Sequence, residues 1–224
     1  MAGPHEVLGM SRVLGIGTTE FLARYADNGG TTLRSEADGR CVFLTSSGCR
    51  VHPRRPLVCR LYPLGRSTNE RGEERFALFP PQAECEAVAG RDGTIETFLG
   101  PQGVGPYFVW SRRYGELYRR MMGLLDRLDI EGKIDAPLAD TPAEAAQAGS
   151  GSAGSGQEPD RAPLSSWQDV DASLAEYCAA KEIAMPTEID DTIALHLRAM
   201  EEWLDDLESR LGEDQNDPKG APES

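Results

Sequence analysis

The stretch that decides the fold runs from Cys41 to Pro63 and reads CVFLTSSGCRVHPRRPLVCRLYP. Three of the five cysteines of the chain fall inside it, and a fourth, Cys85, follows after a polar segment. The intervals between these cysteines hold turn formers and basic side chains, whereas a buried strand or helix would place apolar residues there periodically. The spacing therefore indicates a cysteine cluster and not thiols that serve only for packing.

Four thiolates can close around zinc as a tetrahedral set or around an iron–sulfur centre, and both need turns that bring the ligands together. Turn formers flank Cys49, with Ser46-Ser47-Gly48 before it and His52-Pro53 after it. The intervals contain seven, nine and twenty-five residues, and they match neither the paired CxxC knuckles of zinc ribbons nor the ferredoxin spacings. The residues alone leave zinc and iron open.

Basic residues dominate this stretch. No Asp or Glu lies between Cys41 and Asn69, although the whole chain carries a net charge of -14. Positive charge beside a thiol lowers its pKa and favours the thiolate that metals need, and it offsets the negative charge of an all-thiolate centre. The same side chains could pair with carboxylates elsewhere in so acidic a chain, and the two interpretations are compatible. The residues concerned are Arg50, Arg54, Arg55, Arg60 and Arg66.

The elements CVFL, CRVH and RRPLVCRLYP, followed by a later lone cysteine, resemble the second half of the YkgJ-like cysteine-cluster family, named for its CxxCxxCC signature. The resemblance extends more loosely on both sides, over about Val7 to Tyr107. The family is known as zinc- or iron-chelating. The positions that match its pattern are Cys41, Cys49, Arg55, Pro56, Cys59, Arg60 and Pro63.

The resemblance implies a metal site formed by four thiols, Cys41, Cys49, Cys59 and Cys85. It also implies a first cysteine group, CxxCxxCC, upstream of the first helix, where this sequence has none. We therefore expect either that the reading frame starts further upstream or that this member has lost half of the family's ligands.

Three further side chains are expected around the centre. Arg55 and Arg60 would contact the ligands and not the metal itself. They would offset the negative charge of the centre and fix the loop that carries it. His52 is the one plausible nitrogen ligand because it lies three residues after Cys49. We favour a structural or hydrogen-bonding role for His52, since the family more often has tyrosine at this position.

Composition excludes several classes of protein. No run of 18 apolar residues occurs, and the N-terminus lacks the apolar region of a secretory signal, so we expect a cytoplasmic protein with no membrane partner. Strong acidity also argues against nucleic-acid binding. Five cysteines in a cytoplasmic chain indicate metal or redox chemistry more than a disulfide framework.

The pattern along the chain predicts a mainly α fold with short β or irregular segments. A small, metal-stapled cysteine-cluster domain is expected over residues 1–135, and residues 136–165 form a disordered linker rich in Gly, Ser, Ala and Pro. Residues 166–211 form a helical appendage, a hairpin whose last helix carries apolar residues at steps of four and three, and residues 212–224 form a disordered acidic tail.

Three functions remain open. The first is a protein that chelates iron, including an iron–sulfur cluster, or zinc, and serves a structural, electron-transfer or metal-handling role. The second is an iron-dependent enzyme, because the family resembles the cysteine-rich part of flagellin lysine N-methylase. The third is an interaction module that zinc folds and whose C-terminal helices bind a protein partner. No motif in the sequence identifies a catalytic residue.

Overall fold

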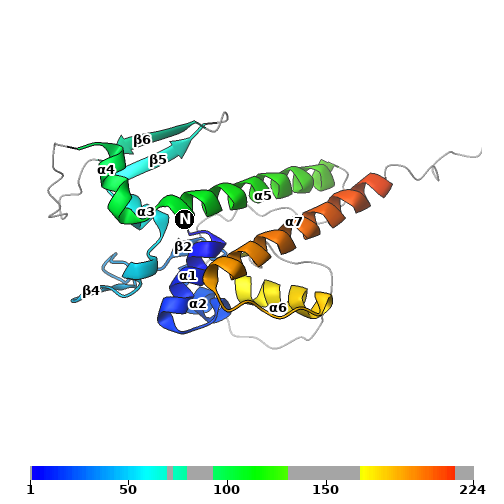
Figure 1. Ribbon diagram of the computed structural model, residues 1–224, viewed down its shortest axis with the longest axis horizontal. Helices are drawn as coiled ribbons and strands as arrows, with labels where there is room; N and C mark the ends of the chain where they lie inside the picture. The colour runs from blue at the N-terminus through cyan, green and yellow to red at the C-terminus, as the bar shows by residue number, and fades with distance from the viewer. Residues whose placement is uncertain (1, 70–72, 80–92, 131–166, 215–224) are drawn as a thin grey trace, which may run out of the picture.

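The computed structural model describes residues 2–69, 73–79, 93–130 and 167–214 (Figure 1). Its helices are α1 (Pro4–Leu14), α2 (Thr18–Tyr25), α3 (Leu57–Leu61), α4 (Ile95–Leu99), α5 (Gly105–Ile130), α6 (Val170–Lys181) and α7 (Ile189–Asp214), with two short 3₁₀ helices, η1 (His52–Arg54) and η2 (Gly100–Gln102). The strands are short and form three separate antiparallel pairs. This confirms the predicted fold class, mainly α with short β segments.

Helices α1 and α2 lie on either side of Gly15-Ile16-Gly17. Pro4 opens α1 because it lacks an amide proton that would need a partner there. Gly15 closes the helix in the left-handed region at φ 69°, a conformation that costs glycine no steric clash. The two helices therefore meet at a sharp corner.

The cysteine-bearing stretch forms hairpins and turns around a small aromatic core. Strands β1 (Ala26–Asp27) and β2 (Thr32–Leu33) pair beside α2, and β3 (Leu44–Thr45) pairs with β4 (Gly48–Cys49). Strands β5 (Leu64–Thr68) and β6 (Glu74–Leu78) form a longer hairpin after α3. The core beneath the first two hairpins consists of Phe21, Tyr25, Phe43 and Val51, with apolar residues of α1.

A second core joins the two ends of the chain. Helices α5 and α7 run side by side, and α6 lies beside α7 next to α1 and α2 (Figure 1). Leu8 of α1 packs in the same cluster as residues of these three helices, among them Leu117, Leu174 and Leu197. The C-terminal helices thus fold back as a hairpin and share a core with α1 and α5.

Hydrogen bonds reinforce this junction at the start of α6. The side chain of Asp171 accepts a hydrogen bond from the backbone amide of Thr18, at 2.8 Å, and so caps α2, whose N-cap residue is Gly17. Arg12 donates to the same carboxylate at 2.9 Å. Burial opposes ionisation of Asp171, but the hydrogen bonds from Arg12 and Thr18 prevail and lower its pKa.

The linker predicted at residues 136–165 lies outside the described residues, as does the tail from residue 215. Helix α7 continues to Asp214, a little beyond the predicted end of the appendage at residue 211. None of the helices within the described ranges is both long and apolar enough to cross a membrane.

Two histidines are buried in the helical core without charged partners. His5 is 4% exposed and His196 is fully buried, and burial lowers the pKa of each to about 4. Both rings are therefore neutral in the native protein at neutral pH. An unfolded chain exposes them and restores the ordinary pKa near 6.5.

We therefore expect stability to fall as the pH is lowered. The unfolded state binds these two protons below pH 6.5 and the native state does not bind them until about pH 4, so each histidine lowers the free energy of unfolding by about 3 kcal/mol across that range. Urea unfolding at several pH values checks this. His196→Phe should make the free energy of unfolding depend less steeply on pH between 6.5 and 4. The same pH dependence as in the wild type would mean that His196 does not contribute to it.

Candidate metal centre

Three of the four predicted ligands, Cys41, Cys49 and Cys59, lie in the described part of the chain. Burial raises the pKa of the Cys59 thiol, and the charges of Cys41 and Cys49 raise it further. Cys41 and Cys59 are exposed and Cys49 is half-buried, so the three cysteines lie at the protein surface. Cys59 is partly covered by other protein atoms.

The hairpin of β3 and β4 places Cys49. Cys49 is paired with Leu44, and Gly48 turns the chain at φ 107°, where a side chain would be strained. The amide of Arg50 donates to the carbonyl of Phe43 at 2.9 Å. Since Phe43 is fully buried, the aromatic core fixes the base of the hairpin.

Helix α3 carries Cys59, and Glu6 of α1 holds its N-terminus. One carboxylate oxygen of Glu6 accepts a hydrogen bond from the amide of Leu57 at 2.5 Å, and the other accepts from the amide of Gly3 at 2.7 Å. Glu6 is 4% exposed, and burial raises its pKa, although both hydrogen bonds oppose this. Helix α3 has only five residues, so this distant carboxylate supplies the cap that its own sequence lacks.

Arg60 joins the cysteine loop to the start of α5. Its guanidinium donates to the carbonyls of Pro53, Arg55 and Gln102 at 2.8, 3.0 and 2.6 Å, and to the hydroxyl of Tyr107 at 3.0 Å. It also lies over the Tyr107 ring, 4.3 Å from the ring centre. A buried guanidinium needs all of its donors occupied, and this one finds partners on both sides of the loop.

Arg55 also joins this loop to the start of α5. It donates to the side-chain oxygen of Gln102 at 2.7 Å and to the carbonyl of His52 at 3.2 Å, and its guanidinium contacts the His52 ring. Its positive charge acts on Cys59 and opposes the rise in the pKa of that thiol. His52 thus meets Arg55, a contact that agrees with the hydrogen-bonding role expected for it.

Cys85, the fourth predicted ligand, lies outside the described residues. Within the ranges that the structure describes, no group of three or more His, Cys, Asp or Glu side chains is arranged to hold a metal ion. Cys178 packs in the helical core on α6. The described thiols have soft donor atoms that suit zinc or iron, but they form no coordination shell among themselves.

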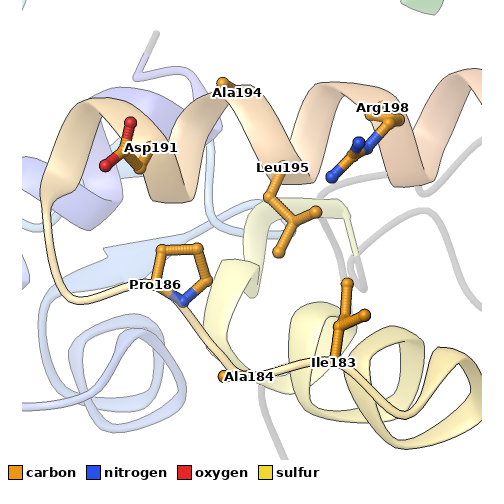
Figure 2. Close-up of a pocket in the computed structure, with 7 residues that line it drawn as sticks. All are labelled: Ile183, Ala184, Pro186, Asp191, Ala194, Leu195 and Arg198. Atoms are coloured by element: carbon orange, nitrogen blue, oxygen red, sulfur yellow. The ribbon is translucent and has the colours of Figure 1, made fainter.

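A separate hollow lies on the C-terminal helices (Figure 2). It is an open groove of about 530 Å³, with Asp191 toward one end of its α7 wall and Arg198 toward the other, and Leu195 between them. No cysteine lines it. The groove is therefore distinct from the thiol group. Its lining residues are Ile183, Ala184, Pro186, Asp191, Ala194, Leu195 and Arg198.

Three residues that hold the loop around Cys59 could not be predicted from local sequence patterns. Glu6, Gln102 and Tyr107 act on Cys59 and its loop from positions more than forty residues away. Glu6 and Gln102 have no local pattern that marks them as partners of this loop. Such pairings become visible only when the chain is folded.

Residues 6–85 match the model of a family described as "CxxCxxCC: Putative zinc- or iron-chelating domain". The match begins at Glu6, which holds α3, and ends at Cys85, the last predicted ligand. No curated protein and no solved structure matches the chain significantly.

Replacing Arg60 by Lys should lower the free energy of unfolding by about 3 kcal/mol, because an ammonium group cannot reach all four acceptors and leaves buried carbonyls unpaired. Arg50→Lys is a matched control, since Arg50 is exposed. Chemical denaturation of both variants tests this. Equal stability of the two would mean that Arg60 does not fix the loop.

Proposed function

We propose that this protein binds zinc or an iron centre through Cys41, Cys49, Cys59 and Cys85, because residues 6–85 match the model of a family described as a zinc- or iron-chelating domain. The observation that supports the proposal is the match of residues 6–85 to this family model, which ends at the last of the four cysteines.

The place of the thiols in the fold favours metal handling or electron transfer over a purely structural role. A structural zinc site is closed and supplies folding energy that a small domain lacks. Here the hairpin of β3 and β4 rests on Phe43, and α3 is held by Glu6 and Arg60. Of the described ligands, Cys41 and Cys59 are exposed, so their side chains are available for exchange of a metal or of an electron.

The surrounding side chains have distinct parts in this proposal. Arg55 supplies positive charge near Cys59 and so favours the thiolate. Arg60 keeps the loop in one conformation, so that little entropy is lost when the ligands close on a metal. His52 orients Arg55. Iron in the site would supply one-electron chemistry, and zinc would supply only charge and geometry.

The described cysteines are all free thiols, which fits a reducing compartment such as the cytoplasm. The apolar stripe of α7 is buried inside this chain against α5 and α6. Its use in the core leaves the stripe little free surface for a protein partner, so we do not assign the C-terminal helices a docking role.

Cys59→Ser should remove most of the bound metal, because serine offers no thiolate. Elemental analysis and visible absorption of protein purified without oxygen measure this, with charge-transfer bands indicating iron and colourless protein indicating zinc. Cys178→Ser is the matched control, since Cys178 lies in the helical core. Full metal content in Cys59→Ser would refute the ligand assignment.

Removal of the metal by a chelator should leave the helical content nearly unchanged, because both cores consist mainly of aliphatic and aromatic side chains. Far-ultraviolet circular dichroism before and after chelation measures this. Cooperative loss of structure on chelation would instead identify a structural zinc site and would contradict the metal-handling proposal.

A further inference from the structure

Helix α3, which carries Cys59, begins without a capping side chain of its own. Its N-cap residue is Pro56, whose ring offers no acceptor to the free amides of the first turn. The carbonyl of Pro56 accepts a hydrogen bond from the amide of Cys59 at 3.0 Å. The amide of Leu57 instead donates to the carboxylate of Glu6, at 2.5 Å. The start of α3 is therefore held by a side chain from another helix.

Glu6 is itself firmly placed. It lies in the first turn of α1 and is 4% exposed, and its second carboxylate oxygen accepts a hydrogen bond from the amide of Gly3 at 2.7 Å. The next two residues of α1 pack in different cores, Val7 in the aromatic core and Leu8 in the helical core. The contact with Glu6 thus fixes the first turn of α3 relative to both cores.

The same carboxylate opposes ionisation of the thiol that it helps to place. Burial raises the pKa of Cys59 most, the charges of Cys41 and Cys49 raise it further, and the charge of Glu6 adds to them. A neutral side chain at this position would therefore favour the thiolate that a metal needs. Glu6 has two opposed effects on Cys59, one through geometry and one through charge.

These two effects depend on different properties of the side chain. Placement of α3 requires the reach of glutamate and two oxygen atoms, one for the amide of Gly3 and one for that of Leu57. The effect of charge requires only a carboxylate at this place. Cys59 is exposed, so solvent and salt screen the charge of Glu6, whereas the capping hydrogen bond is part-buried and has a charged acceptor. We therefore expect placement to be the larger effect.

From this geometry we propose that Glu6 is a positioning residue for the metal centre. It holds the first turn of α3 so that the thiol of Cys59 is in place before a metal binds, and less conformational entropy is lost on binding. The affinity for metal is then set in part by a residue of α1 more than fifty positions before the ligand. This inference rests on the proposed function, since it concerns the metal that Cys59 would bind.

The test uses the full-length, reduced, metal-free protein and Co²⁺ as the probe, with the thiolate-to-cobalt absorption band as the measure of binding. Glu6→Gln keeps the shape of the side chain but offers one oxygen to two amides. Glu6→Asp keeps the charge but is one methylene shorter. Both variants should raise the Kd for Co²⁺ by about tenfold, the size of effect expected when a helix cap is lost.

The two variants separate geometry from charge. If charge were the larger effect, Glu6→Gln would bind Co²⁺ more tightly than the wild type and Glu6→Asp would match the wild type. Either result would overturn the proposal. Weaker binding in both variants is expected only if Glu6 acts by holding α3.

Asp171→Asn is the matched control. Asp171 also caps a helix from a distant part of the chain, through the amide of Thr18, but that helix is α2, which carries no cysteine. The variant should lose stability and keep the Kd of the wild type for Co²⁺. An equal rise in Kd in Asp171→Asn would mean that affinity follows overall stability, and Glu6 would have no positioning role.

Hydrogen exchange of the Leu57 amide, measured by nuclear magnetic resonance on the metal-free protein, tests the contact without any metal. This amide should exchange about tenfold faster in Glu6→Gln and Glu6→Asp than in the wild type, while the amide of Thr18 keeps its rate. Unchanged exchange of Leu57 in both variants would overturn the positioning role. Failure of the wild type to bind Co²⁺ would instead refute the proposed function, and exchange of Leu57 would still decide whether Glu6 holds α3.

Discussion

The buried guanidinium of Arg60 is the interaction on which the cysteine region depends. It reaches the backbone on both sides of its own loop, at Pro53 and Arg55, and the start of α5 through Gln102 and Tyr107. Only a planar group with five donors can satisfy acceptors spread in this way. The loop that carries Cys59 is consequently fixed to the long helix of the bundle and not only to its own neighbours in sequence.

The described part of the protein has two hydrophobic cores, and helix α1 joins them. The aromatic core beneath the hairpins supports Cys49, and the helical core contains α5, α6 and α7. Helix α1 belongs to both, because Val7 and Met10 pack in the first and Leu8 in the second. Glu6, on the same helix, holds α3. The position of the thiols therefore depends on the packing of the whole chain.

Local pattern was sufficient for several features. Helix α1 ends at Gly15 because glycine tolerates the left-handed conformation, and the apolar spacing of α5 and α7 predicts amphipathic helices. The cysteine spacing, with its arginines and prolines, suffices for a resemblance to the chelating family whose model matches residues 6–85. These features depend on residues that are adjacent or one helical turn apart, and such interactions can be read along the chain.

The sequence by itself determined the fold class, the long amphipathic helices and the resemblance of the cysteine-bearing region to a chelating family. Only the tertiary structure brought Glu6 to α3, Gln102 to Arg60, and His5 and His196 to Tyr114. Each of these pairs joins side chains from separate elements whose neighbours in sequence carry no sign of the contact. The reason is physical: a hydrogen bond or a ring contact depends on distance in space, and burial sets its strength only after the elements have packed.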